Sequence, residues 1–169
     1  MKFIEVVGSY NNFTNLKNFV LELIDEYNTD FQKYNQLALQ YYQTPTWDCC
    51  MGKDKTRDET KFINVMPQLQ GTLLDDFFKN VPYKLCRSRI FLARARTQAY
   101  TVHHDKYKRL HLPIVTNKDA YFKSYEDGEK IEKHMPADSS LYLVNTLVDH
   151  TFVNDGNEDR IHIVGSVFR

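Results

Sequence analysis

Cysteine is scarce in this chain: the 169 residues include only Cys49, Cys50 and Cys86, and the first two are adjacent. An odd number of cysteines with this spacing does not indicate a disulfide framework, and no Cys-x-x-Cys pair is present to indicate a cysteine zinc site. The pattern is typical of thiols in a reducing compartment. We therefore expect a cytoplasmic protein whose cysteines are buried or incidental.

Net charge and long apolar runs are missing too. Lys and Arg number 22, and Asp and Glu number 22, so the formal net charge is zero. This balance removes the global attraction that would favour nucleic acid or an anionic membrane, although it leaves a local patch open. No apolar stretch is long enough to span a bilayer, and the start MKFIEVVGSY has no small-residue cleavage site. We expect no membrane segment and no signal peptide.

Glycine is sparse, with 6 residues, whereas Tyr and Phe number 11 each. Bulky aromatic residues favour β-structure, and the length predicts one domain, residues 1–169. Helical spacing of apolar residues nevertheless predicts a helix over 13–27, capped by Thr14 or Asn15, and a second helix over 69–81. The remaining assignments in this half are an extended segment, 36–42, and a polar loop, 44–60.

After Val81 the sequence consists of short β-rich runs, from KLCRSRIFLARARTQAYTVHH to DRIHIVGSVF, separated by charged turn segments such as NKDA and DGNED. Strands at such spacing are typical of a sandwich or a barrel. We therefore expect a mostly β fold in which a helical buttress, about 1–80, supports a β core, about 81–169.

Two of these runs share an Arg-x-His step. Arg109 and His111 stand in RLHLPIV, and Arg160 and His162 stand in RIHIVGSV. Side chains two apart on a strand point to the same face, so each strand presents one arginine and one histidine together. The repeat is either a coincidence on a solvated face or the wall of a cavity that holds an anion.

A third polar pair precedes the first of these strands. His103 and Asp105 stand two apart in TVHHDK and share a face, while His104 points away. With His150 from another apolar run they would complete a set of two histidines and one carboxylate, which binds Fe(II) and leaves open positions. In isolation, the His-x-Asp pair also fits a surface ion pair, and His150 a core histidine.

In this order, the pieces resemble the aspartyl/asparaginyl β-hydroxylase-like branch of the Fe(II)- and 2-oxoglutarate-dependent oxygenases. The match covers residues 85–166, about half the chain, and the resemblance implies a double-stranded β-helix, or cupin-like jelly-roll, that uses iron, O2 and 2-oxoglutarate. The segments that carry it are YTVHHD (100–105), RLHLPIVTN (109–117), HMPAD (134–138), LYLVN (141–145), HTFVN (150–154) and RIHIVG (160–165).

Carried over by position, the resemblance makes His103, Asp105 and His150 the iron ligands. Arg160 matches the arginine that holds the far carboxylate of 2-oxoglutarate, a task suited to a permanently charged guanidinium with parallel donors. Three further positions match or adjoin residues that line the same pocket: Arg109, His111 and His162.

The substrate is the least determined part. Arg94, Arg96 and Trp47 could border the mouth of the pocket and receive an acidic group; a solvated strand edge and packing on the helices are the alternatives. We expect hydroxylation of an Asp, Asn or Pro side chain within a protein or peptide, or of a free amino acid. A cupin-like metal-binding protein without oxygenase activity is the alternative of another class. Nucleic-acid demethylation is disfavoured by the zero net charge.

Overall fold

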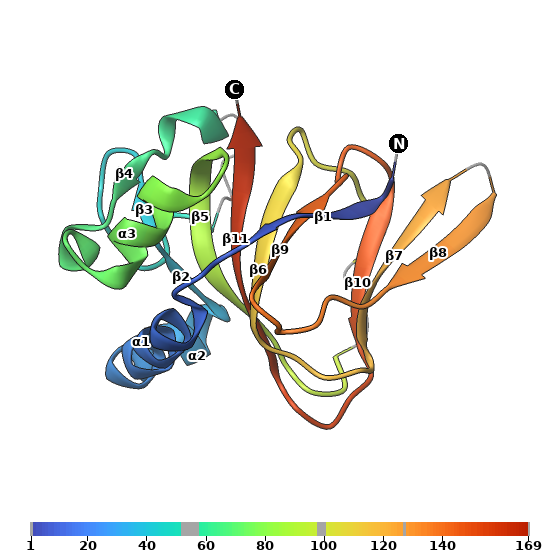
Figure 1. Cartoon of the computed structure of the whole chain (residues 1–169), viewed down its shortest axis with the longest axis horizontal. Coiled ribbons are helices and arrows are strands. Elements are labelled where there is room, and N and C mark those ends of the chain that lie inside the picture. Colours follow the sequence, from blue (N-terminus) through green and yellow to red (C-terminus); the bar gives the residue numbers. More distant parts are fainter. Residues whose placement is uncertain (1, 52–57, 98–100, 127, 169) are drawn as a thin grey trace.

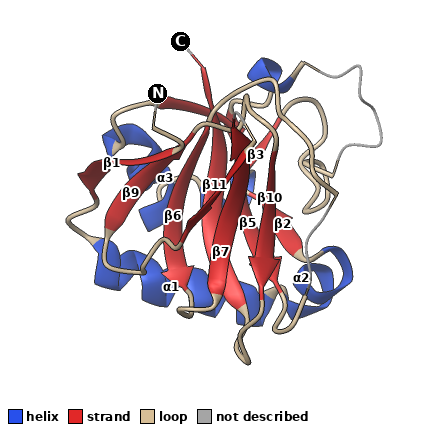
Figure 2. Ribbon diagram, turned by 90° about the vertical axis from the view of Figure 1, so that its right-hand side faces the viewer, coloured by secondary structure: helices blue, strands red, loops and turns tan. Residues whose placement is uncertain are grey.

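The computed structural model describes residues 2–51, 58–97, 101–126 and 128–168. Its elements form three layers: helices, a large antiparallel sheet and a smaller sheet (Figure 1). In the view of Figure 2 the small sheet lies in front, so that β7 and β10 pass before the strands of the large one. The facing antiparallel sheets make the fold a double-stranded β-helix, as predicted.

The large sheet has six strands in the order β1-β9-β6-β11-β5-β2. Two of them, β1 and β2, come from the N-terminal half, so this half contributes to the sheet as well as to the helical layer. No element was predicted over β1. The bounds are β1 (Ile4–Ser9), β2 (Gln36–Ala38), β5 (Lys84–Ala93), β6 (Arg109–Val115), β9 (Ser140–Val144) and β11 (Arg160–Phe168).

The small sheet has the order β10-β7-β8, and a two-stranded sheet pairs β3 with β4. Residues 97 and 103 add isolated bridges to the far edge of the small sheet, where Thr97 lies opposite Asn154 and His103 opposite His150. The bounds of these strands are β3 (Gln40–Tyr41), β4 (Asn64–Val65), β7 (Ala120–Glu126), β8 (Glu129–Lys133) and β10 (His150–Asn154).

The predicted first helix is observed as α1 (Phe13–Glu26), and its apolar stripe is buried. Its N-cap is Asn12 rather than Thr14 or Asn15, and no side chain closes the cap. A second helix, α2 (Asn28–Tyr34), follows directly and was not predicted. Its one buried residue is Phe31, and a single apolar position produces no helical periodicity.

The predicted helix over 69–81 is shorter than expected. A 3-10 turn, η2 (Pro67–Leu69), precedes α3 (Leu73–Asn80). The break has a local cause: Gly71 has φ 74°, and Thr72 is the N-cap, whose hydroxyl accepts a hydrogen bond from the amide of Leu74. A further 3-10 turn, η1 (Glu59–Lys61), lies at the end of the segment predicted as a loop.

The alternation predicted for β6 is confirmed. Leu110, Leu112 and Ile114 are buried in the main apolar core with residues of α1 and α3, and Arg109 and His111 face the other side, toward the small sheet. The strand predicted to continue into residues 101–104 is wrong, because β5 ends at Ala93 and His103 forms only an isolated bridge.

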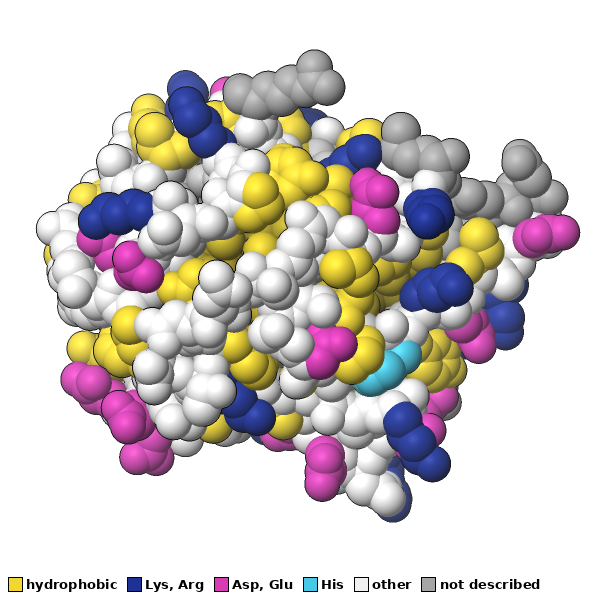
Figure 3. All heavy atoms as spheres, viewed as in Figure 1, with side chains coloured by type: hydrophobic (Ala, Val, Ile, Leu, Met, Phe, Trp, Pro, Cys, Tyr) yellow, Lys and Arg dark blue, Asp and Glu magenta, His cyan; other side chains and the backbone are white. Residues whose placement is uncertain are grey.

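The three cysteines are free thiols, as expected. In the part of the chain that is described, no helix is long and apolar enough to cross a membrane. On the face drawn in Figure 3, acidic and basic side chains are interspersed, in keeping with the zero net charge.

Candidate metal centre and cavity

A cavity of about 400 Å³ lies between the two sheets. This size falls in the range of about 300–1,000 Å³ typical of small-molecule sites. The wall combines apolar rings with a few charged groups, which suits a site that orients a polar ligand away from water. The lining residues are Arg89, Phe91, Thr101, His103, Asp105, Arg109, His111, Phe122, Thr146, His150, Phe152, Arg160 and Val164.

Main-chain hydrogen bonds bring the three predicted metal ligands together. His103 and His150 exchange both backbone bonds, at 3.1 and 2.9 Å, and the amide of Asp105 donates to the carbonyl of Thr146 at 2.7 Å. The segment that carries the first two ligands is therefore fastened to the strand end that carries the third. The candidate ligand atoms of the three side chains lie within 4.8 Å of one another.

Both imidazoles are oriented by backbone carbonyls. Nδ1 of His103 lies 2.8 Å from the carbonyl of Thr101, and Nδ1 of His150 lies 2.9 Å from that of Val148. Because a carbonyl can only accept, each Nδ1 carries the proton and each Nε2 presents its lone pair, as a metal requires. Burial lowers the pKa of His150 below its ordinary value, which favours the neutral, ligating form.

Asp105 is held as a carboxylate by Arg109. Nε and Nη2 of this arginine lie 3.2 Å from the two carboxylate oxygens, and Nε2 of His150 lies 3.8 Å from one of them. Burial raises the pKa of Asp105, but the positive charge and hydrogen bonds of Arg109 outweigh burial, so the pKa lies below its ordinary value. The group is charged at neutral pH and available to a cation.

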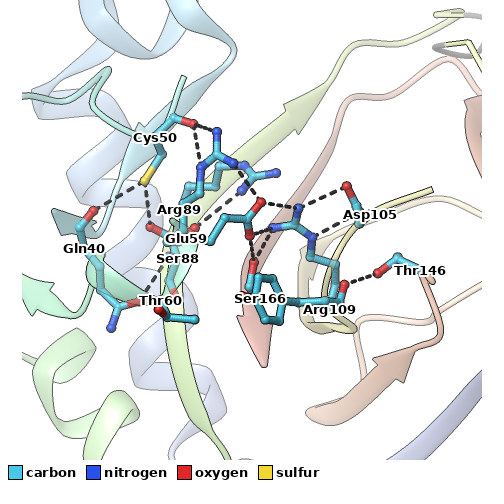
Figure 4. A network of polar contacts seen from close by, with 12 residues as sticks. Gln40, Cys50, Glu59, Thr60, Ser88, Arg89, Asp105, Arg109, Thr146 and Ser166 are labelled. Carbon is cyan, nitrogen blue, oxygen red and sulfur yellow. Dashed lines mark hydrogen bonds and ion pairs between the residues drawn. The ribbon is translucent and has the colours of Figure 1, made fainter. Parts of the chain in front are cut away.

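The other side of Arg109 contacts Glu59, which sequence reasoning missed (Figure 4). Glu59 accepts from Arg109, from Arg87 at 2.9 Å and from the hydroxyl of Ser166. Arg109 also donates to Ser166. Arg109 was expected to line the co-substrate pocket; it does line the cavity, but its guanidinium is already engaged by two carboxylates.

Arg160 is the second predicted cation of the cavity. Its side chain is 2% exposed, and its guanidinium lies 4.1 Å from the ring centre of Phe152 and 5.3 Å from that of Phe122. Nη2 donates to Nδ1 of His162 at 2.7 Å. The geometry keeps the planar cation in one orientation against the rings while it faces the cavity.

His111, which lines the cavity, and His162, which does not, form a buried pair with their Nδ1 atoms 3.3 Å apart. Burial and the nearby charge of Arg160 lower both pKa values well below the ordinary range, so both rings are neutral. Since Nδ1 of His162 accepts from Arg160, Nδ1 of His111 is the donor of the pair. The Nε2 atoms of both rings have no hydrogen-bond partner among the described residues.

The predicted substrate residues lie elsewhere. Arg94 donates to Gln32 and Asn35, Arg96 donates to Asn157, and neither lines the cavity. The ring of Trp47 lies 4.4 Å from that of Tyr27 in the helical layer. The assignment of Arg94, Arg96 and Trp47 to substrate binding stays a prediction, and none of the three lines this cavity. Of the loop 44–60, residues 52–57 lie outside the described residues.

Seven lining residues were not foreseen as such, and Thr101, Thr146 and Val164 are three of them. Arg89 and Phe91 come from β5, Phe122 from β7 and Phe152 from β10. His104 is exposed and contacts Asp149 at 3.3 Å, pointing away from the ligands as predicted. The aromatic residues carried no signal of their own, because apolar residues of a buried strand are expected on either face.

The fold and the site define a class: a double-stranded β-helix with two imidazoles and one carboxylate converging in the cavity between its sheets. This donor set suits a divalent transition metal and leaves coordination positions open. The residues present therefore fit a non-heme metal, and Arg160 adds a positive charge to the wall of the same cavity.

Comparison with solved structures agrees with this fold. A nickel complex of the non-heme monooxygenase ThoJ aligns over 98% of this chain and 74% of that one, with a TM-score of 0.51 and 9% identity. A prolyl-4-hydroxylase from Pseudomonas putida aligns over 99% of this chain and 88% of that one, with a TM-score of 0.51 and 12% identity. No family model and no curated protein sequence matches the chain.

Proposed function

We propose that the chain is an Fe(II)- and 2-oxoglutarate-dependent hydroxylase that acts on an amino-acid side chain of the Asp, Asn or Pro type, within a protein or peptide. The observation that carries the proposal is the convergence of His103, Asp105 and His150 in a jelly-roll cavity that also contains Arg160. The ordered segments quoted above favour the aspartyl/asparaginyl β-hydroxylase-like branch, and the reduced cysteines favour the cytoplasm.

Each residue has a definite task in this proposal. The Nε2 atoms of His103 and His150 and the carboxylate of Asp105 would hold the ion, and Arg109 keeps that carboxylate ionised and oriented. Arg160 would bind the far carboxylate of 2-oxoglutarate through two parallel donors. When bound, iron and 2-oxoglutarate supply oxidative decarboxylation by O2 coupled to hydroxylation of a C–H bond.

The aromatic wall has a task as well. Phe91, Phe122 and Phe152 surround the polar groups with apolar surface. Such a wall restricts water, which strengthens the charge-assisted contact of Arg160 and limits side reactions.

The alternative of another class, a metal-binding protein without oxygenase activity, leaves Arg160 unexplained. Burying a guanidinium is costly, and a bare metal site gains nothing from a cation in its wall. A free amino acid as substrate is the alternative within the proposed class.

Succinate release tests the proposal. The purified protein is incubated with Fe(II), 2-oxoglutarate and a protein extract of its host, and succinate and peptides gaining about 16 Da are measured by mass spectrometry. We expect both, and neither for His150→Ala. Hydroxylation of free proline, aspartate or asparagine without any peptide shift would move the substrate to a free amino acid. If neither the host extract nor the free amino acids produce iron-dependent succinate release, the proposed oxygenase activity is contradicted.

A further inference from the structure

Arg89 presents a cation to the cavity without an acidic partner. Its Nη1 lies 3.4 Å from the carbonyl of Arg87, and its guanidinium lies 5.9 Å from the ring centre of Phe91. Within the described ranges these are its polar and ring contacts, and no carboxylate pairs with it. The side chain is half-buried and lines the cavity.

The other arginines of this region are already engaged. Arg87 pairs with Glu59, and Arg109 pairs with both Glu59 and Asp105. Burial, assisted by the neighbouring charge of Arg109, lowers the pKa of Arg89 to about 10, so it stays protonated at neutral pH but at a cost in free energy. A group held charged at such a cost is typical of a binding site that an anion completes.

Arg89 also lies apart from Arg160. In the pairing of β5 with β11, Arg89 stands opposite Val164 and Ala93 stands opposite Arg160. Their Cα positions are therefore four strand residues apart, which is about 13 Å along the sheet. In the proposed function the far carboxylate of 2-oxoglutarate binds Arg160 and its other end contacts the metal. Arg89 is then left for another anion.

The metal centre lies toward Arg89 along the sheet. Arg109, which holds Asp105, stands opposite Ser166 on β11, two residues beyond Val164. Arg89 therefore faces the part of the cavity next to the ligands, where a substrate has to lie.

The carboxylates next to Arg89 do not neutralise the arginines around it. Arg87, Arg89 and Arg109 carry three positive charges, and Glu59 and Asp105 carry two negative charges, so this cluster has an excess of one positive charge. A divalent ion and the 2-oxoglutarate dianion would cancel each other, and an anionic substrate would neutralise the excess.

We propose that Arg89 binds a carboxylate of the substrate, so that the substrate class is an acidic side chain of a protein or a free amino acid held by its α-carboxylate. This inference rests on the function proposed above. It moves substrate recognition from Arg94 and Arg96 to a residue inside the cavity.

Calorimetry on the Mn(II)-loaded protein saturated with 2-oxoglutarate, in the absence of O2, tests the proposal without turnover. Four probes are titrated: L-aspartate, L-proline, N-acetyl-L-aspartic acid α-amide and N-acetyl-L-prolinamide. The first three carry a carboxylate and the last carries none. Binding of the aspartic acid amide identifies a side-chain carboxylate; binding of the free amino acids alone identifies the α-carboxylate.

We expect Arg89→Gln to weaken the binding of the carboxylate probe about 30-fold or more, as for loss of a charge-assisted contact. Arg89→Lys should recover part of this affinity. Lys84→Gln, the same charge change at an exposed position of β5, should leave it unchanged. Apo Arg89→Gln should unfold at a temperature no lower than the wild type, because it removes an uncompensated charge.

The outcomes separate the two proposals. If 2-oxoglutarate does not bind the Mn(II)-loaded wild type, the proposed function fails. If it binds but no carboxylate probe binds, or one binds Arg89→Gln as tightly as the wild type, only the role of Arg89 is overturned. A loss of 2-oxoglutarate affinity in Arg89→Gln would also overturn this role and assign Arg89 to the co-substrate.

Discussion

Glu59 offers the sharpest test of how the metal centre is supported. Its carboxylate accepts from Arg87 at 2.9 Å and from Arg109 at 3.3 Å, and its side chain is only 12% exposed. Removing one partner of a buried ion pair costs about 3–5 kcal/mol. Both arginines keep another acceptor, Asp105 for Arg109 and the carbonyl of Cys50 for Arg87, so the cost of Glu59→Gln should be lower. We expect a loss of about 2–3 kcal/mol in the free energy of unfolding.

Urea denaturation of the metal-free protein measures this loss, and thermal unfolding should show a decrease of about 4–12 °C in Tm. Glu132→Gln is the matched control, because Glu132 pairs with Lys130 at 2.9 Å but is 41% exposed. We expect this variant to lie within about 0.5 kcal/mol of the wild type. Equal losses in the two variants would refute the reasoning.

The difference in unfolding free energy between the wild type and Glu59→Gln should depend on pH in a definite direction. Burial raises the pKa of Glu59, but Arg109, Ser166 and Arg87 outweigh it, so the pKa lies below its ordinary value. A depressed folded pKa means that the ionised form stabilises the protein above the unfolded pKa of about 4.3. This stabilisation is lost as the pH falls through the folded pKa. The difference between wild type and Glu59→Gln should therefore be full at pH 7 and shrink below about pH 4.

Three further predictions follow from the site. His103→Ala should abolish stoichiometric Mn(II) binding in calorimetry, whereas His104→Ala, whose ring points away, should retain it; the reverse result would shift the ligand register by one residue. Arg160→Ala should raise the Kd for 2-oxoglutarate about 30- to 1,000-fold, with partial recovery in Arg160→Lys, and an unchanged Kd would exclude Arg160 as its anchor. His111→Phe should reduce the acid sensitivity of the metal-free protein. A buried neutral histidine with a depressed pKa lowers the free energy of unfolding by about 1.4 kcal/mol for each pH unit below about pH 6.5, because the unfolded chain binds the proton and the folded one does not. The slope of unfolding free energy against pH should therefore fall by this amount in the variant, and an equal slope would show that the ring is not buried and neutral.

The sequence predicted those parts of the site that depend on local pattern. Leu110 and His111 fall on opposite faces because a strand alternates strictly, and this assigned one face of β6 to the core. The alternation left the polar face as either a solvated surface or a cavity wall, and the family resemblance favoured the cavity that the structure shows. His103 and Asp105 were found because a histidine and a carboxylate two apart stand close to such a strand. The third ligand, His150, needed the resemblance or the structure, because 45 residues separate it from Asp105.

Contacts between distant segments could not be predicted. Glu59 lies in a 3-10 turn 46 residues before Asp105, and nothing around it indicates a buried acid. Arg89 is one of four arginines in RSRIFLARAR, where alternation does not show which of them face inward. The strand is also irregular: Arg87 has φ 51°, next to a register shift between β5 and β11. Arg87 reaches Glu59, Arg89 lines the cavity, and Arg94 contacts α2 through Gln32.

The metal dependence of 2-oxoglutarate binding tests the central claim most directly. Calorimetric titration of 2-oxoglutarate into the metal-free and the Mn(II)-loaded protein compares the two states with no substrate and no turnover. One molecule per chain should bind the Mn(II)-loaded protein, and the metal-free protein should bind it far more weakly, because His103, Asp105 and His150 would hold the ion that one end of the molecule contacts. Equal binding with and without metal, or none with metal bound, would contradict the account.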